Sequence, residues 1–556
     1  MKLIILVLIF TGCVQMINAQ TTVAKDDSGK FTVFKSGKTA GSETFTIKNG
    51  ESSESSTSVD LGARVLNFKT TTEYKGGLAK VFTLDQEPNI KLQFAINGNE
   101  VKVTGVQETT GKTDESALIL ENLVWHQYYF LIQHYDSKKG GAQRFKALVP
   151  SVLATVGVSI ERKDTGITFE GIPVKLDHYQ AIFEPATAVH IWTDSSGRVV
   201  DVAIPAQGLE AMREEYAAKI DAFHKGIDEL QKNRPKVEID YSAPADAPFT
   251  AEEVTVQAKG HTLGGTLLLP KNGKGPFPAV ITITGSGQQT RDEPIALPGL
   301  EKYKPFRQIA EALASKGIAV LRVDDRAVGK STGLEGIKEA TTFDYADDTR
   351  AQVAFLRTRK EIDPNRIGLI GHSEGGVIAP LVASTDPKIA AIVLLAGSGK
   401  TGEKVLMDQA VFSLDENPNT TKEHREAALQ QQQMLLTAAM SGDMKVNVPD
   451  QMRLPWYVAF MKYDPIPTIR KVHQPILILQ GEKDQQVTAE QAPLLQQAAL
   501  AAGNKDVTMK VFPGLNHLFL PSKTGAFSEY SHLEVTTLQP DVLDTITTWF
   551  QRKLKP

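Results

Sequence analysis

Two different patterns of hydrophobic and polar positions divide the chain. Between residues 20 and 205, short runs alternate between apolar and polar side chains, for example at 31–34, 43–47 and 91–96, and they are bounded by Gly, Asn and Ser. Alternation with a period of two is typical of strands that bury one face. This pattern predicts an all-β N-terminal domain over residues 20–205.

The segment that follows has a different pattern. Residues 208–233 are charged and rich in Glu, Ala and Lys, and Arg234-Pro235 ends the run. We expect a helical linker over residues 206–240, with a domain boundary near residue 240. Within the first domain, the serine-rich stretch 52–58 is interpreted as a loop.

The second half of the chain predicts an α/β domain over residues 241–556. Near-continuous apolar runs are separated by helical segments, which is typical of a mostly parallel sheet covered on both faces. The runs that we interpret as strands are 279–283, 318–323, 366–370, 391–395, 475–479 and 507–512. Residues 400–470 interrupt this alternation with a helical insert rich in Met and Leu. We interpret it as a cap over the active site, and the alternative is a helical excursion that only covers the sheet edge.

The N-terminus predicts export. Lys2 precedes a purely apolar stretch at 3–10, and Ala19 offers a small residue at a cleavage site that would leave Gln20 as the first mature residue. Residues 1–19 are therefore interpreted as a signal peptide. The only cysteine, Cys13, ends a Phe-Thr-Gly-Cys sequence that resembles a bacterial lipoprotein signal, so an acyl anchor at Cys13 is an open alternative.

Composition narrows the class of protein. Of 556 residues, 41% are hydrophobic and 23% are charged, which is close to a globular average. The 61 basic and 65 acidic residues nearly balance, and this argues against a nucleic-acid partner. After the first twenty residues no apolar run is long enough to span a bilayer. Residues 20–556 contain no cysteine, so we expect neither disulfides nor cysteine–metal sites there.

The strand at 366–370 leads into the strongest chemical motif. The sequence Gly371-His372-Ser373-Glu374-Gly375 fits G-x-S-x-G, and a helical segment follows it. In a strand–turn–helix setting this motif forms a nucleophile elbow, where a strained turn exposes the serine above the sheet. The pattern predicts Ser373 as the nucleophile and the backbone N–H of Glu374 as an oxyanion donor.

A serine nucleophile needs a base and an acid that orients the base. Asp484 lies shortly after the strand at 475–479, and His517 lies shortly after the last strand. The order serine, acid, histidine is the one expected for this motif. We predict that His517 accepts the proton of Ser373 and that Asp484 orients the imidazole, with Glu482 as an alternative acid.

The second oxyanion donor is expected after the first parallel strand. Thr284-Gly285-Ser286-Gly287 follows the run 279–283, and glycines in such a loop let main-chain N–H groups face a ligand. We interpret the N–H of Ser286 as the second donor, and Gly287 is the alternative. An ordinary glycine turn remains the competing interpretation.

From about residue 250 to the end, the chain resembles α/β-hydrolase carboxylesterases of the serine-aminopeptidase and dienelactone-hydrolase branch. Besides the elbow, the residues that carry the resemblance are Gly285, Ser286, Gly287, Arg291, Asp292, Asp324, Asp325, Arg326, Gly329, Ser331, Gly481, Asp484, Asn516 and His517. The resemblance implies hydrolysis of esters through a covalent acyl-enzyme, without a metal or cofactor. Ala327 stands where many relatives have glycine, and this departure affects no expected catalytic residue.

The sequence therefore predicts an exported serine hydrolase whose substrate is a small-molecule carboxylic ester. Two alternatives remain. A serine peptidase would use the same three side chains, although no repeat of about 45 residues indicates the β-propeller domain that related oligopeptidases carry. A non-catalytic envelope protein would bind its ligand through the β domain.

Overall fold

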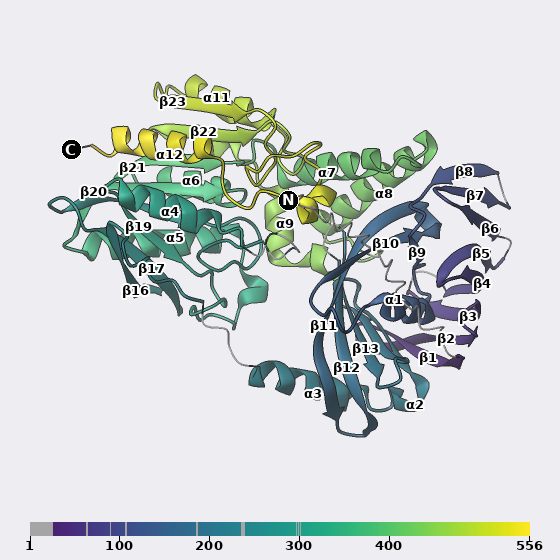
Figure 1. Cartoon of the computed structure of the whole chain (residues 1–556). Coiled ribbons are helices and arrows are strands. Elements are labelled where there is room, and N and C mark those ends of the chain that lie inside the picture. Colours follow the sequence, from purple (N-terminus) through teal and green to yellow (C-terminus); the bar gives the residue numbers. More distant parts are fainter. Residues whose placement is uncertain are drawn as a thin grey trace, which may run out of the picture.

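Each half of the chain forms its own β-sheet in the computed structural model (Figure 1). The description covers residues 26–555, except for 63–64, 89, 106–107, 185–186, 235–238, 296, 298–299, 301 and 447. The expected signal peptide and Cys13 lie outside the described residues. Within the described part, no helix combines the length and the hydropathy needed to cross a membrane.

The N-terminal half folds into one sheet of fifteen strands in the order β8-β7-β6-β5-β4-β3-β2-β1-β15-β14-β13-β12-β11-β10-β9. Neighbours are antiparallel, apart from β9 and β10, which run parallel. The prediction of an all-β domain is confirmed. The strands are β1 (Asp27–Lys35), β2 (Lys38–Lys48), β3 (Ser52–Asp60), β4 (Val65–Lys75), β5 (Leu78–Gln86), β6 (Ile90–Asn97), β7 (Glu100–Thr104), β8 (Thr109–Lys112), β9 (Leu118–Ile119), β10 (Gln143–Val149), β11 (Ala154–Phe169), β12 (Ile172–Phe183), β13 (Thr187–Asp194), β14 (Val199–Ile204) and β15 (Leu209–Arg213).

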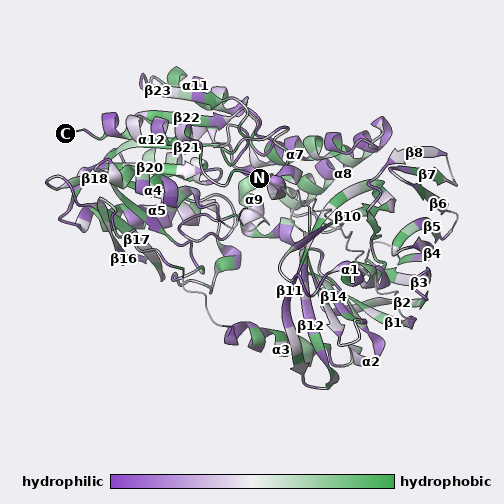
Figure 2. Cartoon of the chain, viewed as in Figure 1, coloured by the Kyte–Doolittle hydropathy of each residue, from purple (hydrophilic) through white to green (hydrophobic). Residues whose placement is uncertain are grey.

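A short helical segment fills the concave side of this curved sheet (Figure 1). It consists of η1 (Trp125–Gln127) and α1 (Tyr128–His134). Trp125 is 1% exposed, and the rings of Phe130 and Tyr74 stack with their centroids 4.0 Å apart. Hydrophobic and hydrophilic residues alternate along the surrounding strands (Figure 2), because only one face of each strand packs on this core.

The serine-rich stretch 52–58 is not a loop, contrary to the prediction, because it belongs to strand β3. Every second side chain, at Ser53, Ser55 and Thr57, is buried. The hydroxyl of Ser55 forms a hydrogen bond of 2.8 Å with the hydroxyl of Thr70 on β4. Ser55 fits this inward face because its hydroxyl and that of Thr70 satisfy one another.

The predicted helical linker 206–240 begins with a strand instead. Strand β15 pairs with β1 on one side and β14 on the other, and it joins the first and last parts of the domain. Its final residue, Arg213, is buried in an ion pair with Asp27 of β1. In the described part of this segment, the α-helices α2 (Glu214–Ala217) and α3 (Ile220–Asn233) follow the strand. Two short 3-10 helices lie earlier in the domain, η2 (Pro150–Val152) and η3 (Pro205–Gln207).

The C-terminal half forms an eight-stranded sheet in the order β16-β17-β19-β18-β20-β21-β22-β23. The pairs β16–β17 and β17–β19 are antiparallel, and every later pair is parallel. The prediction of a mostly parallel sheet is confirmed. The strands are β16 (Phe249–Ala258), β17 (His261–Pro270), β18 (Phe277–Ile283), β19 (Ala319–Val323), β20 (Ile362–His372), β21 (Ile389–Leu395), β22 (Ile476–Gly481) and β23 (Val507–Phe512).

Helices cover both faces of this sheet, and each face has its own hydrophobic core. On one face pack α4 (Pro305–Ser315) and α12 (Pro540–Lys553). On the other face pack α5 (Thr342–Thr358), α6 (Gly375–Ala383) and α11 (Gln491–Ala501). Burial of both faces explains why the strands are continuous apolar runs in the sequence.

The predicted cap is also confirmed as a helical insert between β21 and β22. It contains α7 (Gly402–Glu416), α8 (Lys422–Ser441), α9 (Pro455–Lys462) and α10 (Ile466–Ile469). The remaining short helices of the domain are η4 (Ile337–Glu339), η5 (Asp450–Arg453) and η6 (Phe527–His532).

The cap also contacts the N-terminal domain (Figure 1). Asn419, in the turn between α7 and α8, exchanges two hydrogen bonds with the backbone of Lys112 at the end of β8. Its amide also donates to the carbonyl of Leu153, at 2.7 Å. The β domain therefore holds the outer end of the cap.

A buried charged network lies at the centre of the β domain. The Glu43 carboxylate accepts hydrogen bonds from the backbone N–H groups of Trp125 and His126 and from the His126 ring, at 2.8 to 3.1 Å. The other ring nitrogen of His126 bonds the Ser53 hydroxyl at 3.0 Å. Glu43 and the His126 side chain are both fully buried.

Removing the Glu43 carboxylate is expected to destabilise this domain strongly. Glu43→Ala leaves three buried N–H donors without an acceptor, so we predict a loss of about 3–5 kcal/mol of unfolding free energy in urea titrations followed by circular dichroism. The matched control is Glu54→Ala, at an exposed side chain of β3, which we expect to cost less than about 0.5 kcal/mol. Equal losses in the two variants would refute the structural role of Glu43.

Candidate active site

Ser373 lies at a sharp turn between the end of β20 and the start of α6. Its φ of +54° falls in the left-handed region, which is strained for a residue with a side chain. The Ser373 N–H donates to the carbonyl of Leu395 on the neighbouring strand, at 2.8 Å, and this bond fixes the turn against β21. The side chain is half-buried, so the strained turn leaves the hydroxyl partly accessible.

Three glycines make this turn sterically possible. A Cβ at Gly371 would lie 1.9 Å from the carbonyl oxygen of Gly375, and a Cβ at Gly375 would lie 2.1 Å from the carbonyl oxygen of Ile283. A Cβ at Gly376 would lie 2.7 Å from the Cα of Gly397. Backbone therefore touches backbone on every side of the turn, and only glycine fits.

The structure brings Asp484 and His517 together. His517 Nδ1 lies 2.8 Å from Asp484 Oδ2, and both side chains are almost fully buried. The Asp484 carboxylate also accepts the backbone N–H groups of Gln486 and Val487 and the side-chain amide of Gln480. These donors stabilise its charged form and hold it towards His517.

Glu482, the alternative acid, lies elsewhere. Its side chain is exposed and accepts the backbone N–H of Gly514 at 2.9 Å, without a contact to the His517 ring. The geometry therefore favours Asp484 over Glu482 as the partner of the histidine.

His517 lies beside the turn that carries Ser373. The ring of His372, the residue before Ser373, is 4.8 Å from the His517 ring, and His372 Nε2 donates to the His517 carbonyl at 3.0 Å. The Ser373 hydroxyl forms no hydrogen bond to any described residue, so a direct bond to His517 is not formed here. Hydrogen bonds at catalytic sites often tighten only when substrate binds.

The expected oxyanion loop, which follows β18, lies against Ser373. A Cβ at Gly285 would lie 3.2 Å from the Cβ of Ser373. The N–H of Gly285 already donates to the Glu293 carboxylate at 2.6 Å. The backbone N–H groups of Ser286, Gly287 and Glu374 have no hydrogen-bond partner among the described residues. The structure thus leaves both candidate loop donors available near the serine.

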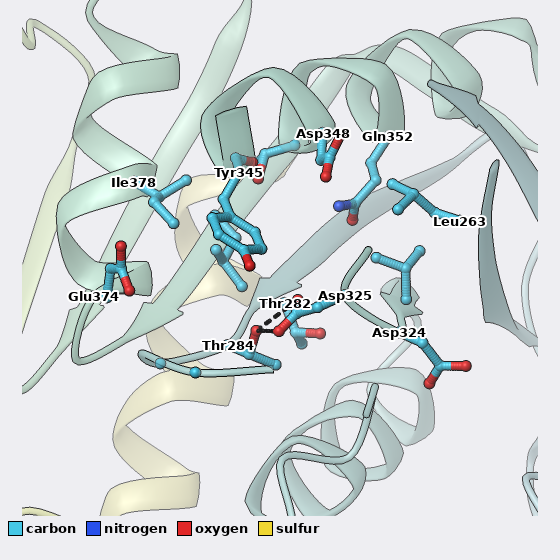
Figure 3. A pocket seen from close by; sticks show the side chains of 15 residues that line it. Leu263, Thr282, Thr284, Asp324, Asp325, Tyr345, Asp348, Gln352, Glu374 and Ile378 are labelled. Atoms are coloured by element: carbon cyan, nitrogen blue, oxygen red, sulfur yellow. Dashed lines mark hydrogen bonds between the residues drawn. The ribbon is translucent and has the colours of Figure 1, made fainter. Parts of the chain in front are cut away.

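Asp325, a half-buried carboxylate of the resemblance motif, holds this loop in place. The Thr284 hydroxyl donates to both Asp325 oxygens, at 2.9 and 3.0 Å, and the N–H of Gln289 also donates to Asp325. Figure 3 shows Thr284 directed at Asp325, with Tyr345 and Glu374 across a cavity of about 20 Å³, which is enough for one water. Burial raises the pKa of Asp325 to about 8, although these hydrogen bonds lower it.

Two ion pairs that involve residues of the resemblance motif have a structural role. Arg291 binds Asp324 through two parallel hydrogen bonds, of 3.0 and 2.8 Å, and Asp292 forms a buried ion pair with Arg322. A Cβ at Gly329 would lie 2.4 Å from the Asp324 carboxylate. These residues shape the segments after β18 and β19, and their side chains do not reach the reacting groups.

The Glu374 side chain connects the elbow to the cap. Its carboxylate accepts the hydroxyl of Thr342 at 2.5 Å and the indole N–H of Trp456, on α9 of the cap, at 2.9 Å. Burial raises the pKa of Glu374, and the two hydrogen bonds partly offset this. The sequence analysis missed this connection, because nothing in the sequence pairs position 374 with position 456.

No role was predicted for Glu293 and the His372 ring, which form a buried contact of 3.0 Å next to Ser373. The only sequence signal is their position, next to the motif residues Asp292 and Ser373. No group of three or more His, Cys, Asp or Glu side chains in the described part of the chain has the arrangement of a metal site.

Comparison with known proteins agrees with this architecture. Residues 295–523 match the family model described as serine aminopeptidase, S33. Esterase EstD of Thermotoga maritima is 26% identical over 313 residues, which cover 54% of this chain and 68% of EstD. A putative hydrolase of Bacillus subtilis, YtaP, is 26% identical over 170 residues, which cover 26% of this chain and 56% of YtaP.

One solved structure that is similar to this chain is the Pyrococcus furiosus esterase PF2001. The two chains are 18% identical with a TM-score of 0.39, and the match covers 58% of this chain and 98% of PF2001. The predicted resemblance of the C-terminal half to α/β-hydrolases is confirmed by the family match and the relatives. The expectation that the chain is a hydrolytic enzyme is confirmed as well.

Loss of the indole N–H of Trp456 should loosen the cap. Trp456→Phe removes one buried hydrogen bond to Glu374, worth about 1–3 kcal/mol, so we predict faster hydrogen–deuterium exchange in α9. Trp549→Phe is the matched control, because the Trp549 N–H is buried without a partner in α12. If exchange in α9 were the same in both variants, the Trp456–Glu374 bond would not hold the cap.

Proposed function

We propose that this α/β-hydrolase is an exported serine carboxylesterase that uses Ser373, His517 and Asp484 and forms an acyl-enzyme. The observation that carries the proposal is the buried 2.8 Å contact between His517 and Asp484 beside the strained turn at Ser373. The name of one relative, Esterase EstD, supports an ester substrate.

The first half of the reaction forms the acyl-enzyme. His517 Nε2 accepts the proton of the Ser373 hydroxyl as its oxygen attacks the ester carbonyl carbon. The carbonyl oxygen becomes an oxyanion, and the N–H groups of Glu374 and of Ser286 or Gly287 donate to it. When the tetrahedral intermediate collapses, the C–O bond to the alcohol breaks and His517 returns the proton to the leaving alcohol.

The second half releases the acid. A water molecule gives a proton to His517 and attacks the acyl carbon, and the ester bond to Ser373 breaks as the proton returns to the serine oxygen. Asp484 stays ionised and holds the Nδ1–H tautomer of His517, so that Nε2 is the nitrogen that exchanges protons. Ser373, His517 and Asp484 return to their starting protonation states, so each cycle consumes only one ester and one water molecule.

Peptide hydrolysis by the same groups is the alternative activity, and the description of the matching family as a serine aminopeptidase favours it. As far as the structure describes it, the N-terminal domain is one continuous sheet without the repeated four-stranded blades that would restrict access to peptides. A panel of short-chain esters assayed beside peptide amides separates the two activities. Faster turnover of peptide amides than of esters would contradict the esterase assignment and favour a peptidase.

A non-catalytic binding role for the β domain is the second alternative. Failure of the folded protein to react with a fluorophosphonate would favour this role.

Export is proposed from the charged, apolar and small residues of positions 1–19, with acylation of Cys13 as an open alternative. The mass of the mature N-terminal peptide distinguishes cleavage before Gln20 from acylation of Cys13.

Loss of the Ser373 hydroxyl should abolish ester hydrolysis. Ser373→Ala removes the nucleophile, so we predict a fall in kcat of at least about 10⁴-fold on a short-chain chromogenic ester. Circular dichroism should remain unchanged, because the half-buried hydroxyl has no hydrogen bond to lose. Undiminished turnover in the folded variant would defeat the assignment.

The two acids near β22 give a matched test of the role of Asp484. Asp484→Asn removes the charge that orients His517, and we predict a drop in kcat of about 10⁴-fold. Glu482→Gln, two residues away, should change kcat by less than about threefold, because Glu482 contacts only a backbone N–H. The reverse ranking would make Glu482 the acid.

A further inference from the structure

A second histidine–carboxylate pair lies directly beneath the proposed catalytic residues. Glu293 is 2% exposed and has a φ of +53°, so the backbone is strained at a buried charge. His372, the last residue of β20, is also buried. The Glu293 carboxylate lies 3.0 Å from His372 Nδ1, and neither side chain belongs to the mechanism described above.

Both ring nitrogens of His372 face acceptors. Nδ1 faces Glu293 Oε1, and Nε2 faces the backbone carbonyl of His517 at 3.0 Å. A backbone carbonyl can only accept a hydrogen bond, and an ionised carboxylate likewise only accepts. Both hydrogen bonds can form at once only if both nitrogens carry protons, which makes the ring an imidazolium.

The alternative is a neutral ring next to a protonated Glu293, and the geometry disfavours it. Oε1 already accepts the N–H of Gly285 at 2.6 Å, so it is poorly placed to carry the proton. Oε2 is buried without a partner among the described residues, and a proton there would be unsatisfied. Burial lowers the pKa of His372, but the charge and hydrogen bond of Glu293 and the carbonyl of His517 outweigh it, and the pKa is raised overall.

We propose that His372 is a positioning residue whose imidazolium form, paired with Glu293, holds the loop of His517 in its catalytic place. The inference rests on the proposed function, since it assigns His372 a role in orienting the base. His372 touches no substrate in this account, and it acts only through His517 and Glu293.

The pair ties together the three segments that must converge. Glu293 holds the oxyanion loop through the N–H of Gly285. His372 is covalently next to Ser373 and therefore moves with the elbow. Its Nε2–H holds the carbonyl of His517, while the hydroxyl of Tyr303 holds the next carbonyl, at Leu518. Hence one ion pair links nucleophile, oxyanion loop and base.

Deprotonation of His372 would break this arrangement. A neutral ring has one N–H, so it can satisfy Glu293 or the His517 carbonyl but not both. The contribution of the pair is complete below the ordinary histidine pKa and is lost as pH rises through the raised pKa of the folded protein. We therefore expect an alkaline limb in kcat that belongs to His372.

Other titratable groups surround the pair and must be separated from it. The His517 ring lies 4.8 Å from the His372 ring, with Asp484 and Tyr530 on the same side. Burial raises the pKa of Tyr530 far above this range. On the Glu293 side lie Tyr303, whose pKa burial also raises, and Asp325. Asp325 has a pKa of about 8, so it is a competing source of an alkaline limb.

The test is the pH dependence of kcat and KM for the full-length protein and four variants. His372→Gln keeps a pH-independent amide donor for the His517 carbonyl, so we predict that the alkaline limb disappears. The maximal kcat should fall about tenfold to 100-fold with little change in KM, because the amide cannot form the ion pair with Glu293 and holds His517 less precisely, while the substrate contacts stay.

The second informative variant is Glu293→Gln. Neutralising the carboxylate removes the charge that favours the imidazolium, so the alkaline limb should move to lower pH. His473→Gln is the matched control at an exposed histidine, and its profile should equal that of the unmodified protein. In Asp325→Asn the limb should persist.

An alkaline limb that survives His372→Gln, or that vanishes in Asp325→Asn, would overturn the proposal. Ring-nitrogen NMR of ¹⁵N-histidine-labelled protein tests it without any assay of activity, with the signal assigned by its absence in His372→Gln. A His372 ring that carries one proton at neutral pH would also overturn it. Failure of the proposed function would appear separately, as undiminished turnover in Ser373→Ala.

Discussion

The contact of backbone with backbone around Ser373 is the constraint on which the site depends. A strand and a helix can meet at so sharp an angle only because Gly371, Gly375 and Gly376 have no side chains, and the strain is concentrated at Ser373 itself. The hydroxyl is thereby aimed from the end of the central strand, where the loops after the neighbouring strands converge. Every other group of the site is placed relative to this turn.

Those neighbouring loops are held by buried charges. Arg291 with Asp324 orders the segments after β18 and β19, and Glu293 with His372 connects the oxyanion loop to the elbow. Buried ion pairs contribute little net stability, because desolvation offsets their attraction, but breaking one by removing a partner is costly. We interpret the role of these pairs as fixing the conformation of the loops and not as adding stability. The cap is tied to the same point through Glu374.

Much of the fold followed from local pattern. Continuous apolar runs predicted the parallel strands, and the G-x-S-x-G sequence between a strand and a helix predicted the turn at Ser373. The candidate acid and base could be named because Asp484 and His517 each come shortly after a strand. What escaped prediction depends on contacts between distant segments. Ser53 and Ser55 of β3 are buried against hydroxyls of β4, strand β15 pairs with β1, and His372 meets Glu293 across 79 positions of sequence.

The most direct test of the central claim is to find where a mechanism-based probe attaches. The folded protein is treated with a fluorophosphonate, digested, and the modified residue is located by tandem mass spectrometry. The account predicts one adduct, on Ser373, formed in proportion to the loss of esterase activity. An adduct on a different residue, or full esterase activity in protein that carries the adduct on Ser373, would contradict it.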